Sequence, residues 1–148
     1  MTLVSKDYIF DVWTSNRDSE EKVLRRIKIG NGQSLYNFAK AITKAFGFYF
    51  DHCFGFYDNI ERYCNSKASF ELFADIGEEP LSPTTKSVKK TKIGQVFQAV
   101  GDRILFLFDY GDDWHFIVEL KEIEPAMGKG RKAEVLESIG EAPEQYSR

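Results

Sequence analysis

The stretch Phe108–Phe116 reads F-D-Y-G-D-D-W-H-F and lies between two apolar runs, Ile104–Phe108 and Phe116–Ile123. Both runs are rich in aromatic and β-branched residues, which favour strands. Gly111 and Asp112 suit the centre of a two-residue turn, because such turns need residues that tolerate positive φ. The stretch therefore predicts a hairpin with an acidic tip. The predicted pairs are Tyr110 with Asp113, Asp109 with Trp114, and Phe108 with His115.

Two alternating runs open the chain and are followed by a helical one. Tyr8–Thr14 places apolar residues at every second position, and so does Val23–Ile29 except at Arg25, as strands with one buried face do. The polar loop between them predicts an antiparallel hairpin. In Leu35–Phe46 the apolar residues recur at helical spacing. Ser34 is suited to cap the start of this helix, and Gly47 is suited to end it in the left-handed conformation.

The aromatic segment Phe48–Tyr57 alternates and predicts a third strand, with His52 on the same face as four phenylalanines. Asp58-Asn59 then predicts a two-residue turn and a return strand, Ile60–Cys64. In that register the two cysteines of the chain, Cys53 and Cys64, face each other. Two thiols rather than a disulfide are expected in a reducing cytosol.

The remaining elements complete the predicted fold. They are a short helix at Ala68–Ile76, a loop at Gly77–Thr85, a second helix that Thr91 caps and Gly101 ends, the strands of the acidic hairpin, a mobile Gly- and Lys-rich loop at Pro125–Lys132, and a last strand or turn of helix at Ala133–Ile139. This order predicts one α+β domain, with two or three helices on one face of a mixed, mostly antiparallel sheet. Its β-β-α opening is β-grasp-like. The predicted core spans about 8–124, the basic loop 125–132 and the C-terminal segment 133–146.

Composition limits the class of protein. A chain of 148 residues with 43% hydrophobic and 29% charged residues suits one globular domain. The formal net charge of -3 opposes binding to nucleic acid by the molecule as a whole. No apolar run approaches the ~18 residues that span a bilayer. We therefore expect a cytoplasmic monomer or homodimer with no membrane partner and no cofactor, whose partner is a protein or, less in keeping with the charge, a nucleic acid.

The acidic tip has two interpretations. In the first, its carboxylates accept amide hydrogen bonds of the turn and only stabilise the hairpin. In the second, His52 and His115 approach Asp109 or Asp113, and a His–Asp pair then acts as a general base. The residues Tyr110, Asp112 and Trp114 are the candidates for contacting a ligand. The sequence holds no H-x-H, HExxH or C-x-x-C pattern, so no metal ligands are predicted.

Basic residues gather in two predicted loops. A site that contacts phosphates is one interpretation, and solvated loops are the other. The candidate residues are Lys86, Lys89, Lys90, Lys129, Arg131 and Lys132.

Several motifs together resemble the plasmid pRiA4b ORF-3-like family, from about Tyr8 to Tyr146. They are Asp51-His52, the stretch Lys92–Val100, Tyr-Gly-Asp-Asp-Trp at 110–114, and the tail with Gly-Glu-Ala-Pro at 140–143 and Gln145-Tyr146. Many members carry a histidine two residues after the tryptophan. Here that position is Phe116, and His115 is displaced by one residue, which in a strand moves it to the opposite face.

The resemblance implies a fold but no reaction. The leading hypothesis is a non-catalytic binding or accessory domain for a protein or nucleic-acid partner. The alternative is a metal-dependent or His/Asp-based hydrolase that uses the acidic tip.

Overall fold

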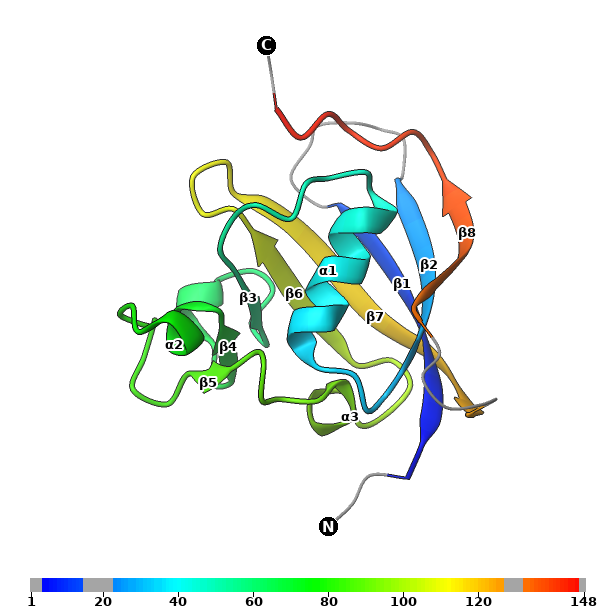
Figure 1. Ribbon diagram of the computed structural model, residues 1–148, viewed down its shortest axis with the longest axis horizontal. Helices are drawn as coiled ribbons and strands as arrows, with labels where there is room; N and C mark the ends of the chain where they lie inside the picture. The colour runs from blue at the N-terminus through cyan, green and yellow to red at the C-terminus, as the bar shows by residue number, and fades with distance from the viewer. Residues whose placement is uncertain (1–3, 15–22, 127–131, 147–148) are drawn as a thin grey trace.

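The computed structural model describes residues 4–14, 23–126 and 132–146, and in them eight strands form one sheet (Figure 1). The strand order is β5-β4-β3-β6-β7-β1-β2-β8. Only β4 and β5 pair in parallel, and every other pair is antiparallel. The strands are β1 (Lys6–Thr14), β2 (Leu24–Gly30), β3 (Phe54–Tyr57), β4 (Ser69–Glu71), β5 (Lys86–Ser87), β6 (Arg103–Phe108), β7 (Trp114–Pro125) and β8 (Glu134–Ile139). The predicted single α+β domain with a mixed, mostly antiparallel sheet is confirmed.

Three α-helices accompany the sheet: α1 (Leu35–Ala45), α2 (Phe73–Ile76) and α3 (Ile93–Val96). Figure 1 shows α1 lying across one face of the sheet, with α3 near its first turn and α2 beside β4 and β5. The Ser34 side chain accepts a hydrogen bond from the Asn37 amide at 3.0 Å, and Gly47 has a φ of 72°. The predicted N-cap and the predicted helix end are both confirmed.

The main core lies between α1 and the sheet. Alternate residues of β1, β3, β6 and β7 point to this face, as the period of a strand requires. Its centre is a chain of rings in which Phe106 lies 4.9 Å from Phe56, 5.7 Å from Phe54 and 5.8 Å from Phe116, between centroids. A smaller cluster on the opposite face is built on Tyr57, Leu105 and Leu107.

A buried cation connects α1 to the edge of the sheet. The Arg25 side chain donates to the carbonyl of Ala45 at the end of α1, at 3.0 Å. It also donates to the carbonyls of Leu24, Ile139 and Gly140, at 2.9, 3.2 and 3.1 Å. Arg25 therefore joins the last turn of α1, β2 and the end of β8 through four backbone oxygens.

The central segment differs from its prediction. Only Phe54–Tyr57 of the predicted strand Phe48–Tyr57 pairs in the sheet, although the rings of Phe48 and Phe50 still pack against the core. Aromatic side chains are buried here whether or not the backbone forms a ladder, so alternation overestimated the length of the strand. The predicted return strand Ile60–Cys64 is also wrong, because β3 pairs instead with β4, Tyr57 opposite Ser69.

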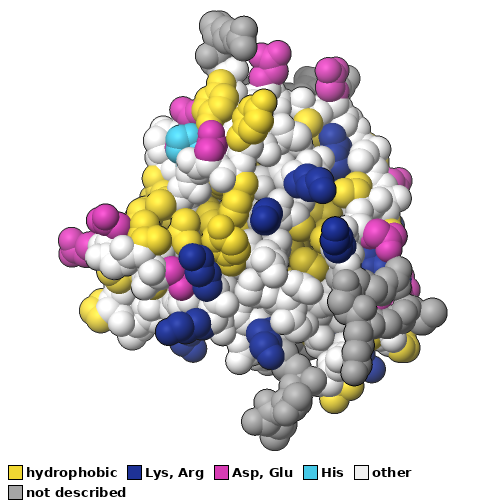
Figure 2. Space-filling view, in the orientation of Figure 1, with side chains coloured by type: hydrophobic (Ala, Val, Ile, Leu, Met, Phe, Trp, Pro, Cys, Tyr) yellow, Lys and Arg dark blue, Asp and Glu magenta, His cyan; other side chains and the backbone are white. Residues whose placement is uncertain are grey.

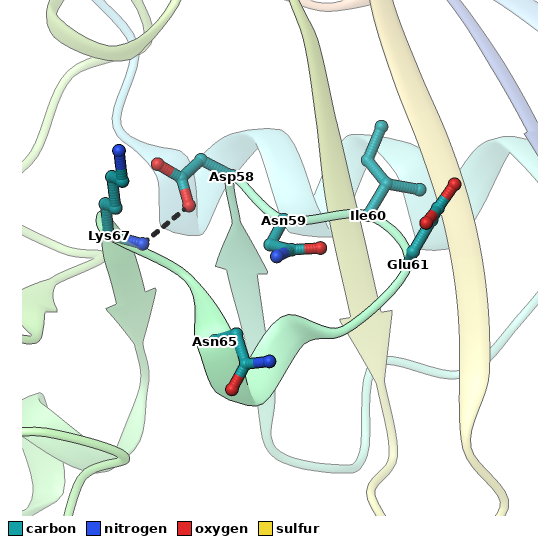
Figure 3. Close-up of a pocket in the computed structure, with 6 residues that line it drawn as sticks. All are labelled: Asp58, Asn59, Ile60, Glu61, Asn65 and Lys67. Carbon is teal, nitrogen blue, oxygen red and sulfur yellow. Dashed lines mark hydrogen bonds between the residues drawn. The ribbon is translucent and has the colours of Figure 1, made fainter.

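A wide loop takes the place of the predicted Asp58-Asn59 turn (Figure 3). The Asp58 carboxylate accepts hydrogen bonds from the amides of Lys67 at 2.9 Å and Ala68 at 3.1 Å, which closes a loop of about ten residues. Ile60 packs against the small cluster on the opposite face of the sheet. A two-residue turn would leave both the carboxylate and Ile60 without these contacts.

The two later helices differ from their predictions, and the alternative of strand or helix at Ala133–Ile139 is resolved. The predicted helix at Ala68–Ile76 is instead strand β4 followed by the single turn of α2. The second helix is only four residues long, and the Thr91 hydroxyl donates to the Ser87 carbonyl at 2.6 Å rather than capping it. The segment Ala133–Ile139 contains strand β8, not a helix. Most of the predicted mobile loop, residues 127–131, lies outside the described residues.

Cys53 and Cys64 are both free thiols, in different environments. Cys64 is exposed, whereas burial raises the pKa of Cys53, with a smaller contribution from the negative charge of Glu78. Since the thiolate is the reactive form, iodoacetamide at pH 8 is expected to alkylate Cys64 several times faster than Cys53. Peptide mapping by mass spectrometry measures both rates, with the urea-unfolded protein as the control in which they converge. Equal rates in the folded protein would contradict the arrangement.

Candidate functional site

The acidic tip is a five-residue loop rather than a two-residue turn. Phe108 pairs with Trp114, not with His115, so the predicted register was wrong by one residue. Positive φ falls on Asp109 (65°) and Asp113 (57°), while Gly111 does not adopt it. The Asp113 amide donates to the Asp109 carbonyl at 2.6 Å. The Asp109 carboxylate accepts from the amides of Gly111 and Asp112, at 3.1 and 3.3 Å, and thereby organises the loop.

The corrected register decides which side chains face the core. Trp114 and Phe116 are fully buried on the α1 face, where the Trp114 ring lies 4.8 Å from that of Phe48. His115 lies between them in the strand and points to the opposite face. This is the orientation that a displacement by one residue along a strand predicts. Trp114 is therefore a core residue and is not exposed to a ligand.

His52 belongs to a polar cluster on the α1 face. Its Nε2 lies 3.4 Å from a carboxylate oxygen of Asp109, 3.5 Å from one of Asp51 and 2.9 Å from the Tyr146 hydroxyl. Tyr146 donates to Asp51 at 2.6 Å, and this hydrogen bond raises the pKa of Tyr146 to about 12. The cluster draws on three segments that are distant in sequence: the one before β3, the acidic loop and the C-terminal tail.

Gln145 attaches the tail beside this cluster. Its side-chain oxygen accepts from the Tyr49 amide at 2.7 Å, and its Nε2 donates to the Tyr49 carbonyl at 3.1 Å. Two backbone hydrogen bonds from one buried glutamine give the tail a fixed position. The pair Gln145-Tyr146 is visible in the sequence, but no pattern of neighbouring residues predicts that it attaches the tail to Tyr49.

His115 has a separate set of neighbours. Its Nε2 lies 2.7 Å from a carboxylate oxygen of Asp113, and its ring lies 6.3 Å from that of Tyr63. His52 lies beside Asp51 and Asp109, whereas His115 lies beside Asp113 on the opposite face of the sheet, so the two imidazoles do not share a site. Among the described residues, no group of three or more His, Cys, Asp or Glu side chains has the arrangement of a metal site.

The two other tip residues are also separated. Asp112 is exposed at the end of the loop. The Tyr110 hydroxyl lies 2.6 Å from the Tyr57 hydroxyl, on the face opposite α1.

A groove between α1 and β8 has a volume of about 750 Å³. This lies within the range of about 300–1,000 Å³ that is typical of ligand sites. Apolar side chains and lysines line it together. The apolar residues are Ile27, Ile29, Ala41, Ala45 and Val135, and the lysines are Lys40, Lys44 and Lys132, with Glu134 as the one carboxylate.

The α1 lysines of the groove belong to a longer row that ends at Lys89, outside the groove. Tyr36, Lys40 and Lys44 follow one another at spacings of four residues and so lie on one side of the helix. The Lys89 ammonium lies 5.1 Å from the centre of the Tyr36 ring and extends this row. α1 carries no carboxylate, and no described carboxylate forms an ion pair with these lysines. Figure 2 shows the basic side chains gathered over this face, with apolar surface on both sides.

The basic residues predicted from sequence lie in three places. Lys86, Lys89 and Lys90 are exposed on the segment between α2 and α3, and Lys132 lines the groove. Lys129 and Arg131 lie outside the described residues. Lys40 and Lys44 were missed, although their spacing of four residues on the polar side of a predicted helix was visible.

One mixed sheet with a single long helix across it, and with a lysine-rimmed groove at its edge, defines an α+β protein with a candidate binding surface. The chain belongs to the plasmid pRiA4b ORF-3-like protein family, whose model matches residues 9–146. Among solved structures, it is similar to a protein of unknown function from Methanosarcina mazei Go1, with a TM-score of 0.72 and 19% identity over 95% of this chain and 73% of that one.

At that identity the similarity shows the fold alone. No curated protein matches the chain. No helix within the described ranges has both the length and the apolar character needed to cross a membrane.

Proposed function

We propose that the protein is a non-catalytic binding domain, which holds an acidic and partly apolar segment of a protein partner in the groove between α1 and β8. The observation that carries this proposal is the combination of an apolar floor with lysines on both sides of it. Carboxylates of the partner meet Lys40, Lys44 and Lys132, and its apolar side chains cover Ala41 and Val135.

Strand β8 lines one side of the groove, and its outer edge offers a second contact surface to the same partner. It is the last strand of the sheet, so its outer edge has no neighbouring strand among the described residues. Val135, Leu136 and Ile139 are 49%, 44% and 44% exposed, which is high for apolar residues of a strand. An extended peptide can add to such an edge through backbone hydrogen bonds, while side-chain pockets provide specificity.

A nucleic acid fits this surface less well. Phosphates would pair with the lysines, but a sugar–phosphate backbone would leave the apolar floor of the groove uncovered. The net charge of -3 also opposes long-range attraction of a polyanion. The hydrolase alternative lacks support, because it needs His52 and His115 to converge and they lie on opposite faces.

Selection of random 12-residue peptides displayed on phage tests this proposal. Enriched sequences are expected to combine Asp or Glu with Leu, Ile or Val. Binding of the synthetic peptides is expected to weaken about tenfold in Lys40→Glu, because one favourable charge contact becomes a repulsion. Lys67→Glu is the matched control, since it makes the same change of charge in the loop after β3 and leaves the groove intact.

Four outcomes would overturn the proposal, and three of them concern the peptides. They are the enrichment of basic or uncharged peptides, no enrichment at all, and equal loss of binding in both variants. A fourth is tighter, Lys40-dependent binding of random-sequence DNA or RNA in a mobility-shift assay, which would assign the surface to nucleic acid.

The proposal also places the protein in the cytoplasm as a monomer or homodimer, and the free thiols of Cys53 and Cys64 suit a reducing compartment.

A further inference from the structure

A second hollow opens on the opposite face of the sheet, between β4, the segment after α2 and the acidic loop. Its volume is about 270 Å³, which is room for a small group rather than for a drug-sized ligand. Three aromatic residues, Tyr63, Phe73 and Tyr110, line it together with two carboxylates, Glu71 and Glu79. None of its lining residues is Lys, Arg or His.

Glu71 is the buried charge of this hollow, with only 2% of the residue exposed. The Tyr57 hydroxyl donates to one carboxylate oxygen, and the Leu81 amide donates to the other at 2.8 Å. A carboxylate offers about four positions that can accept a hydrogen bond, so about two of those of Glu71 remain for a ligand. No Lys, Arg or His of the described residues forms an ion pair with Glu71. Because buried carboxylates are ordinarily paired with a cation, the hollow lacks the positive charge that such a group attracts.

The neighbouring tyrosines do not supply that charge. The Tyr57 hydroxyl lies between Glu71 and the Tyr110 hydroxyl, 2.6 Å from the latter. Burial raises the pKa of Tyr57 and of Tyr110, so both hydroxyls remain neutral donors. The two hydroxyls meet over Gly55, where an added Cβ would lie 2.7 Å from each oxygen. The contact between the two tyrosine hydroxyls therefore requires a glycine at position 55, because any larger residue would collide with them.

Aromatic rings form much of the wall of the hollow and bear on which cation it suits. The rings of Phe73 and Tyr110 lie 4.9 Å apart between centroids, and the ring of Tyr63 lies 4.8 Å from that of Tyr57. Aromatic rings beside a carboxylate suit an organic cation, because the carboxylate attracts the charge and the rings offer apolar surface to the carbon chain. A metal ion would instead require more oxygen ligands than this hollow provides.

We propose that this hollow binds an alkylammonium cation, whose charged end meets Glu71 and whose carbon chain lies against Phe73 and Tyr110. The side chain of a lysine in a polypeptide and a free aliphatic amine share this chemistry. The site lies on the face opposite α1 and is independent of the groove described above.

Titration of the ¹⁵N-labelled protein with n-butylammonium chloride, followed by NMR, tests the site. The Leu81 amide is expected to shift in a saturable way, with a dissociation constant in the millimolar range. Glu71→Gln is expected to weaken binding at least about tenfold, because a charge-assisted contact becomes a neutral one. Glu79→Gln is the matched control, with an expected change of less than about twofold because Glu79 is exposed. If Glu71→Gln fails to fold, Phe73→Leu replaces it, with an expected loss of about threefold.

The neutral analogue 1-butanol is expected to cause no saturable shift. Binding of 1-butanol as tight as that of n-butylammonium would overturn the proposal, and so would unchanged affinity in Glu71→Gln or in its replacement. Titrations with Nα-acetyl-lysine-N-methylamide and with spermidine separate the two sources of the cation. Tighter binding of the lysine derivative assigns the hollow to a polypeptide, and tighter binding of spermidine assigns it to a free amine.

Discussion

Replacing Phe106 with alanine is expected to lower the free energy of unfolding by about 3–5 kcal/mol, the cost of deleting a fully buried phenylalanine. Phe106 is 0% exposed and lies at the centre of the aromatic chain that joins β3, β6 and β7. Its removal leaves a cavity that its neighbours cannot close, because several of them are rigid rings. Guanidinium denaturation, followed by tryptophan fluorescence, measures the change.

Two companion variants make this test specific. Phe106→Leu retains most of the volume and is expected to cost about 1–1.5 kcal/mol. Tyr49→Ala removes an aromatic side chain that is 73% exposed and is expected to change stability by less than about 0.5 kcal/mol. A cost for Phe106→Ala as small as that of Tyr49→Ala would show that the core is not arranged as described.

Arg25→Ala is expected to lower the free energy of unfolding by about 2–4 kcal/mol, because four backbone carbonyls lose their donor at once. The guanidinium group also stacks 5.2 Å from the centre of the Phe46 ring, and that contact is lost as well. Chemical denaturation measures the loss. Hydrogen exchange is expected to show the earliest opening at the last turn of α1 and along β8, the two elements that this side chain joins.

Arg62→Ala is the matched control, since it removes the same residue type from an exposed position in the loop after β3. No carboxylate of the described residues forms an ion pair with the Arg62 side chain. Its loss is expected to change the free energy of unfolding by less than about 0.5 kcal/mol. Equal effects of the two substitutions would contradict the role assigned to Arg25.

The first third of the fold could be predicted because its signals are local. Alternation gives β1 and β2, and helical spacing with Ser34 and Gly47 gives α1. The segment after α1 resisted prediction because its carboxylates act at a distance. Asp58 accepts hydrogen bonds from amides nine and ten residues further along the chain. No pattern of neighbouring residues shows that a carboxylate will close a wide loop rather than a tight turn.

The residues of the candidate sites likewise fall into those that a local pattern predicts and those that only the fold brings together. The lysines of α1 have a helical period and are visible in the sequence once the helix is predicted. The contact of His52 with Asp109 was among the predicted ones, but its contact with Tyr146 joins segments 94 residues apart. Glu71 shows why a single position carries little information. Its role follows from Tyr57, Leu81 and Tyr110, which the fold brings to it from three separate elements.

The position of β1 inside the sheet also determines when the protein can fold during its synthesis. β1 pairs with β2 on one side and with β7 on the other, with Lys6 opposite Pro125. A ribosome that adds about 5–20 residues per second makes the second partner about 6–24 s after the first residues of β1. During that interval one edge of the N-terminal hairpin and the apolar side of α1 have no sheet to cover them. The newly made chain therefore completes this sheet only after β7 has left the ribosome.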